Sequence, residues 1–183
     1  MKHILFILMT ALLGGSAFAQ MPQGDPAPPD PRLRPLPFYG SLRKDEAQLK
    51  SLPNVNGRTI REMGSRASYS VHGHGLPIQV LERQDMWRFV INSKGDYGWV
   101  PDYYVSMART FEVIGSEPIN LRRAAADDAA SVAMLEPGTP GRLLSCPNAS
   151  NWCEVRSFNR RGFVRRDQMW GLGAQEDLRS SAR

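Results

Sequence analysis

Hydrophobic and polar residues alternate over short stretches in the middle of the chain. Residues 78–82, 87–92 and 97–100 are rich in β-branched or aromatic residues, and the segment Ser93-Lys94-Gly95-Asp96 separates the last two. A short apolar run bounded by turn residues predicts a β-strand, and a polar turn between two such runs predicts a hairpin. No window shows a convincing apolar stripe at the 3.6-residue spacing of a helix. The pattern therefore predicts an all-β fold.

This pattern occurs twice. Two blocks align at offsets of 65 and 64 residues: Trp87-Arg88-Phe89-Val90 with Gly98-Trp99-Val100, and Trp152-Cys153-Glu154-Val155 with Gly162-Phe163-Val164. Upstream, residues 75–81 match 138–144 at an offset of 63, and residues 48–50 match 120–122 at an offset of 72, so the first copy holds about nine extra residues between Thr59 and Gly73. Two copies of about 65 residues indicate two small modules. Short strands in so small a module favour a barrel, because closure leaves few exposed edges.

The N-terminus has the pattern of a secretory signal peptide. Residues 1–19 combine Lys2, an apolar run from 4 to 13 and the sequence Ala17-Phe18-Ala19, which predicts cleavage before Gln20. The alternative is a retained membrane anchor, but a spanning helix needs about 20 apolar residues, roughly twice this run. We expect no membrane insertion after cleavage, and a periplasmic or secreted protein.

Two further segments lack a core pattern. Residues 20–37 hold half of the 14 Pro, and this composition predicts an extended linker. Residues 173–183 are short, polar and without periodicity, and they predict a flexible tail.

The repeated blocks carry a resemblance to a known family. The order Trp-x-x-Val, polar turn and Gly98-Trp99-Val100-Pro101-Asp102-Tyr103-Tyr104-Val105 resembles the second half of a Src-homology-3 (SH3) domain. Two copies behind a signal peptide and a Pro-rich leader resemble exported bacterial SH3-like (SH3b) proteins. The resemblance implies two tandem SH3-like barrels of five or six strands, over residues 38–108 and 109–172. It also implies no cofactor, no catalytic residue, and binding to a cell-wall peptide or an envelope protein.

The position of the repeated Trp follows from strand periodicity. Alternate residues of a strand share a face, so Trp87 and Val90 cannot both point into one core without a bulge, and the same holds for Trp152 and Val155. Either each Trp lies on the outside of its barrel, or a bulge brings it inside.

An outward Trp87 would form one wall of an apolar cleft, and exposed aromatic patches tend to mark binding sites. The SH3 resemblance adds Pro101, Tyr103 and Tyr104 to this candidate ligand site. The alternative is that Trp87 only covers the barrel or the contact between the repeats.

The second copy differs at these positions. Pro101 aligns with Arg165 and Tyr104 with Gln168, and residues 156–166 contain five Arg and no acidic residue. Arg binds carboxylates through two parallel hydrogen bonds, so this copy predicts a carboxylate-binding surface. Its candidate residues are Trp152, Arg156, Arg161 and Arg165. The alternative is a solvated face in a chain of net charge +5 that uses mostly Arg as its cation. Export argues against nucleic acid as the partner.

Cys146 and Cys153 are the only cysteines, seven positions apart at the ends of a polar turn. Cross-strand positions of a hairpin bring two cysteines close enough for a disulfide, and an oxidising compartment would keep it. The alternative is a catalytic thiol with a histidine, but after cleavage only His72 and His74 remain, inside the insertion. One His-Gly-His pair without a third ligand predicts no metal site.

We therefore expect a non-enzymatic exported protein that binds peptidoglycan stem peptides or an envelope protein. The alternative is a structural or regulatory subunit whose aromatic faces are buried against a partner protein. A hydrolase would need a nucleophile and a base that converge on one point, and the sequence offers no such pair.

Overall fold

The computed structural model describes residues 34–43, 47–63 and 75–179. The predicted signal peptide, the linker up to residue 33, His72, His74 and residues 180–183 lie outside the described residues. In the described ranges, no helix has both the length and the apolar character required to span a membrane.

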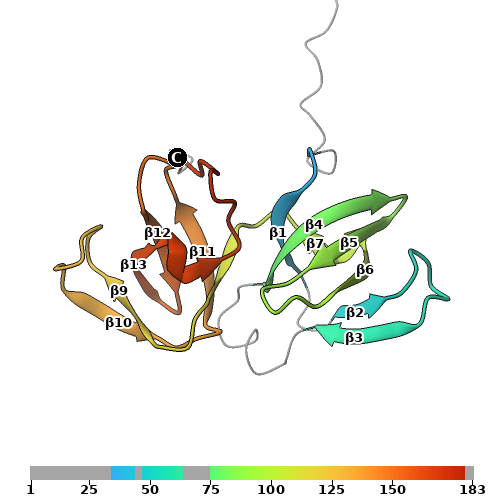
Figure 1. Ribbon diagram of the computed structural model, residues 1–183, viewed down its shortest axis with the longest axis horizontal. Helices are drawn as coiled ribbons and strands as arrows, with labels where there is room; N and C mark the ends of the chain where they lie inside the picture. Colours follow the sequence, from blue (N-terminus) through green and yellow to red (C-terminus); the bar gives the residue numbers. More distant parts are fainter. Residues whose placement is uncertain (1–33, 44–46, 64–74, 180–183) are drawn as a thin grey trace, which may run out of the picture. The chain divides into compact units, whose positions relative to one another are not determined.

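The first domain is one antiparallel sheet of seven strands in the order β3-β2-β6-β5-β4-β1-β7 (Figure 1). Its strands are β1 (Phe38–Leu42), β2 (Ala47–Lys50), β3 (Thr59–Met63), β4 (Pro77–Gln84), β5 (Trp87–Ile91), β6 (Tyr97–Pro101) and β7 (Val105–Ser106). A single 3-10 turn, η2 (Asp102–Tyr104), links β6 to β7.

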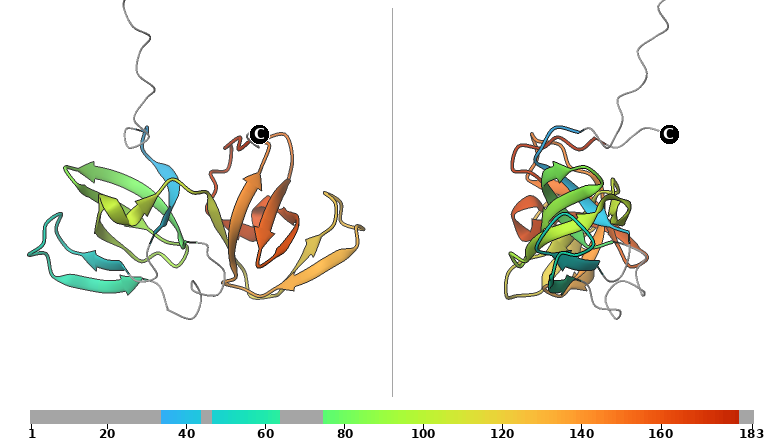
Figure 2. Two further views of the ribbon diagram at one scale, coloured as in Figure 1. Left: turned by 180° about the vertical axis from the view of Figure 1, so that it is seen from behind. Right: turned by 90° about the vertical axis from the view of Figure 1, so that its right-hand side faces the viewer.

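The second domain repeats this topology strand for strand, in the order β10-β9-β13-β12-β11-β8-β14. Its strands are β8 (Thr110–Val113), β9 (Ile119–Arg122), β10 (Ser131–Leu135), β11 (Pro140–Ser145), β12 (Trp152–Ser157), β13 (Arg160–Arg165) and β14 (Met169–Trp170), with η3 (Arg166–Gln168) before β14. Each sheet curls around its own core (Figure 2). The all-β fold with two tandem domains is therefore confirmed.

The number of strands in each sheet differs from the prediction, and the strand bounds give the place of the insertion. Each sheet has seven strands where the resemblance implied five or six, because two-residue strands, β7 and β14, also join the sheets. Thirteen residues separate β3 from β4, and four separate β10 from β11. This difference places the nine-residue insertion of the first copy between β3 and β4.

Strand alternation separates the core from the outer face of each sheet. In β5, Val90 is fully buried, whereas Trp87, Phe89 and Ile91 are partly exposed. The β5–β6 pairing runs from Trp87 to Ile91 without a register shift, so β5 contains no bulge relative to β6. The first of the two alternatives for Trp87 is therefore correct: it lies on the outer face. The β12–β13 pairing is equally regular, and Trp152 also lies outside.

Close packing between neighbouring strands explains the glycine at the start of each Gly-x-Val block. A Cβ on Gly98 would lie 2.9 Å from the Cβ of Leu49, and one on Gly162 would lie 2.5 Å from the carbonyl oxygen of Arg122. Strands β6 and β13 thus pass too close to β2 and β9 for a larger residue.

The cysteines form the predicted disulfide, Cys146–Cys153, with Cα atoms 4.3 Å apart. Both residues are fully buried and belong to the apolar core of the second domain. The bond joins the end of β11 to the start of β12 and so closes the connection between them.

The segment from residue 173 was expected to be a flexible tail. Its described part, residues 173–179, is instead held against the second domain. Leu178 pairs with Cys146 in an isolated antiparallel bridge, and Glu176 forms an ion pair with the buried Arg109. A polar composition predicts exposure, but it does not reveal a partner 67 residues away.

Candidate functional site

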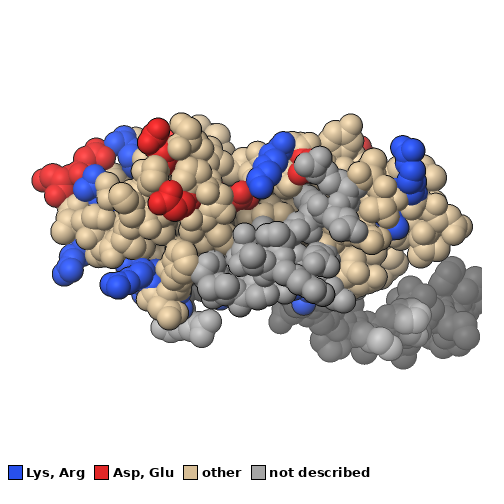
Figure 3. All heavy atoms as spheres, turned by 90° about the horizontal axis from the view of Figure 1, so that it is seen from below, with Lys and Arg blue, Asp and Glu red and all other residues tan. Residues whose placement is uncertain are grey.

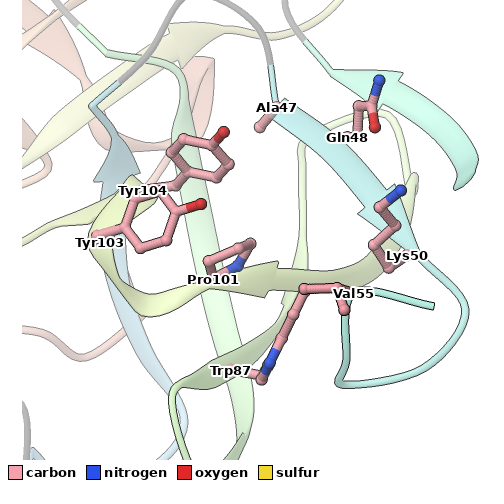
Figure 4. Close-up of a pocket in the computed structure, with 8 residues that line it drawn as sticks. All are labelled: Ala47, Gln48, Lys50, Val55, Trp87, Pro101, Tyr103 and Tyr104. Carbon is pink, nitrogen blue, oxygen red and sulfur yellow. The ribbon is translucent and has the colours of Figure 1, made fainter. Parts of the chain in front are cut away.

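A cavity of about 430 Å³ opens on the first domain. Its lining comes from β2, the β2–β3 loop, β5, the end of β6 and η2: Ala47, Gln48, Lys50, Val55, Trp87, Pro101, Tyr103 and Tyr104 (Figure 4). The four residues that the sequence predicted for this copy all line it. Ala47, Gln48, Lys50 and Val55 were missed, because β2 and its loop carry no motif of their own.

The β5–β6 hairpin and η2 set the position of the aromatic side chains. Trp87 lies directly opposite Pro101 across the hairpin. Pro101 has extended backbone and precedes η2, which presents Tyr103 and Tyr104 with ring centroids 4.5 Å apart. Tyr104 packs against the core, whereas Tyr103 is 63% exposed. One tyrosine is therefore anchored, and the other is available on the surface.

A buried ion pair links the two sides of the cavity. Arg88 is buried, and its Nη2 lies 3.2 Å from Oδ1 of Asp102, the first residue of η2. Arg88 Nη1 also donates hydrogen bonds to the carbonyl oxygens of Asp85 and Trp87, both at 2.9 Å. Arg88 thereby connects the backbone of Trp87 to the turn that carries the two tyrosines. Sequence reasoning missed this pair, although alternation already placed Arg88 on the face of Val90.

The cavity combines apolar walls with a positive charge. Among the described residues that line it, Lys50 is the only charged one, and its Nζ donates a hydrogen bond to Oγ1 of Thr59 at 2.8 Å. Trp87, Pro101 and Val55 supply the apolar surface. An extended chain with an apolar segment and a nearby negative group fits this arrangement.

The second domain fills the matching position with its own side chains. Arg165 Nη1 lies 2.9 Å from both carboxylate oxygens of Asp127, and the guanidinium carbon lies 5.6 Å from the ring centroid of Trp152. Asp127 corresponds to Val55 at the 72-residue offset of β2 and β9, and Arg165 corresponds to Pro101 at the 64-residue offset of β6 and β13. The apolar set of the first domain is thus replaced by an ion pair over an aromatic ring.

The other arginines of residues 156–166 do not form one continuous cationic site. Arg161 pairs with Glu154 at 2.5 Å, and Arg156 is exposed on β12 directly opposite Arg161. Arg166 donates to four backbone carbonyl oxygens, those of Cys146, Pro147, Gly173 and Glu176. On the face shown in Figure 3, basic and acidic side chains are interspersed.

Within the ranges that the structure describes, no group of three or more His, Cys, Asp and Glu residues could hold a metal ion.

Comparison with known proteins gives one family. No curated protein matches the chain. Two solved structures align over 73% of it: NlpC2 from Trichomonas vaginalis, at 9% identity and 48% coverage of that chain, and NlpC1 from the same organism, at 10% and 45%. Both have a TM-score of 0.31, and this chain spans about half of their length. Residues 115–171 match the family described as Bacterial SH3 domain, and the second domain is therefore a bacterial SH3 domain.

Proposed function

We propose that the chain is a non-enzymatic binding protein of the cell envelope, and that the cavity of the first domain holds its ligand. The single observation that carries this proposal is the meeting of Trp87, Pro101, Tyr103 and Tyr104 around one cavity. The ligand is an extended peptide, either a peptidoglycan stem peptide or a segment of an envelope protein.

The chemistry of the lining supports a peptide. Aromatic and proline surfaces bind extended chains with little loss of side-chain entropy, since the rings have few rotatable bonds. Lys50 adds a cation at the same cavity, and the described residues that line it include no acidic side chain. A peptide with a carboxylate next to a small apolar side chain therefore suits both parts of the site, and stem peptides have this character.

The export predicted from the sequence supports the same proposal. The signal-peptide pattern lies outside the described residues, but the disulfide and the bacterial SH3 domain are consistent with an oxidising compartment. We place the protein in the periplasm or outside the cell.

The test is retention on purified peptidoglycan sacculi. The mature chain is compared with its Trp87→Ala, Tyr103→Ala and Tyr104→Ala variants. Tyr97→Ala is the matched control, because Tyr97 is 58% exposed and does not line the cavity. We expect retention to fall about tenfold for the three cavity variants and to stay unchanged for the control. Equal retention of all five proteins, or none by the wild type, would exclude peptidoglycan as the ligand.

A second candidate function rests on another surface of the first domain. Phe89 lies 5.3 Å from Trp99 and 5.8 Å from Tyr97 between ring centroids, on the outer face of β5 and β6. Such an aromatic face suits a subunit that packs against a partner protein. A photo-crosslinking residue at position 97 would then capture a protein in intact cells, whereas one at position 103 would not.

A further inference from the structure

Three arginines lie side by side on the outer face of the second domain. Arg142 of β11 is directly opposite Arg156 of β12, and Arg156 is directly opposite Arg161 of β13. All three are exposed. Directly opposed residues of an antiparallel sheet point to the same face, with Cβ atoms about 5 Å apart. We call these three residues the arginine row.

Like charges at opposed positions destabilise a sheet. Among the residues that the structure describes, a carboxylate balances only one of the three charges, because Glu154 pairs with Arg161. Within the described residues, Arg142 and Arg156 have no hydrogen bond or ion pair from their side chains. Two adjacent guanidinium groups are therefore left to solvent at a cost to stability.

The fold does not require these charges, and the first domain shows this directly. At the same three positions of its sheet it holds Gln79, Ile91 and Tyr97, paired in the same register. The two domains share strand order and core pattern, so the sister domain is an internal control. The row is thus a property of the second domain alone.

Two arginines on the same sheet face are paired with carboxylates. Arg161 holds the carboxylate of Glu154, and Arg165 holds both oxygens of Asp127. Each of these is a guanidinium paired with a carboxylate at hydrogen-bond distance. Arg142 and Arg156 offer the same donors, and no described residue supplies an acceptor for them.

We propose that the arginine row is a docking surface for an acidic peptide segment of a partner protein. Arg142 and Arg156 lie on adjacent strands, so their backbones are about 4.8 Å apart. Acidic side chains at alternate positions of an extended peptide lie about 7 Å apart. The long arginine side chains can span this difference of about 2 Å, so two such acidic residues can engage Arg142 and Arg156 together. This surface belongs to the second domain and does not depend on the cavity of the first.

The experiment measures binding of an octaglutamate peptide to the mature chain by calorimetry at low salt. The row variant is Arg142→Gln/Arg156→Ile, which installs the residues of the sister domain. The control variant is Arg58→Gln/Arg123→Gln, which removes the same charge at two exposed positions outside the row. We expect the row variant to bind about tenfold more weakly or worse, and the control to change less than about twofold.

Thermal unfolding of the same proteins provides the second readout. Relief of like-charge repulsion should raise the midpoint of the row variant by about 2–5 °C, so weaker binding cannot be explained by unfolding. The single variant Arg156→Gln gives an intermediate loss. Equal weakening in the row and control variants would show that only net charge matters and would overturn the proposal. Tighter binding to phosphatidylglycerol vesicles than to octaglutamate would also overturn it, in favour of a lipid surface.

Discussion

Replacing Arg88 with methionine tests the buried ion pair beneath the cavity of the first domain. The Arg88 side chain is only 5% exposed and that of Asp102 15%. Methionine has a similar length and fills the space, but it leaves the Asp102 carboxylate without its cation. It also leaves the Asp85 and Trp87 carbonyl oxygens without the donor that Arg88 supplies.

The magnitude follows from this burial. Removing one partner of a buried pair costs about 3–5 kcal/mol, because the remaining charge stays desolvated and unpaired. Domains of this size have a total stability of about 5–15 kcal/mol, and each kcal/mol shifts the midpoint by about 4–8 °C. We therefore expect the first domain of Arg88→Met to unfold at least about 12 °C below the wild type. The double variant Arg88→Met/Asp102→Leu should recover part of the loss, since it removes both charges.

The assay is scanning calorimetry of the mature chain, with hydrogen exchange to assign each transition to a domain. Asp127→Asn is the control, because Asp127 is 70% exposed and such a surface pair contributes at most about 1 kcal/mol. If Arg88→Met lowers the midpoint no more than Asp127→Asn does, the pair does not support the cavity. A double variant no more stable than Arg88→Met would show that the charges are not coupled.

Three further results are expected. Replacement of both cysteines by serine should lower the unfolding free energy of the second domain by about 2 kcal/mol, as the loop-entropy model gives for this short loop. Calorimetry at constant pH measures this loss, and an unchanged unfolding midpoint would contradict it. Burial alone would raise the pKa of Glu176, but the hydrogen bond and the charge of Arg109 lower it below its ordinary value. This contact therefore stabilises the protein above the unfolded pKa of about 4.3, and the stabilisation is lost as the pH falls through the lower pKa of the folded state. Hydrogen exchange of the 173–179 amides should therefore accelerate in acid, and the Glu176→Gln variant should not show this acceleration. The double variant Val55→Asp/Pro101→Arg should close the cavity with an ion pair like that of the second domain, and unchanged retention on sacculi would refute this role for the two positions.

Features with a local period could be predicted from the sequence. The outward position of Trp87 follows from its three-residue spacing to Val90, and the repeat follows from a comparison of the chain with itself. Both depend on residues close together in the sequence or on two copies of one pattern. The β5–β6 side of the cavity could be predicted for the same reason, because Pro101 and Tyr104 belong to one short sequence motif.

Apart from the Arg88–Asp102 pair, the missed ion pairs depend on partners far away in the sequence. Asp127 is 38 residues from Arg165, and Glu176 is 67 residues from Arg109. The arginine row needs the register of β11 against β12, which contains a shift between Leu143 and Ser145. A one-residue change in register would place a side chain on the other face, so strand pairing had to be known first.

The C-terminal contacts determine where the second domain can be cut for expression. The family match ends at residue 171, yet Arg166 donates to the carbonyl oxygens of Gly173 and Glu176, and the buried Arg109 pairs with Glu176. A chain ended at 171 would remove two of the four carbonyl acceptors of Arg166 and the carboxylate partner of Arg109, and it would uncover the edge of β11 beside Cys146. The stable unit of the second domain therefore extends to at least residue 178, seven residues beyond the family boundary, and an affinity tag belongs after that point.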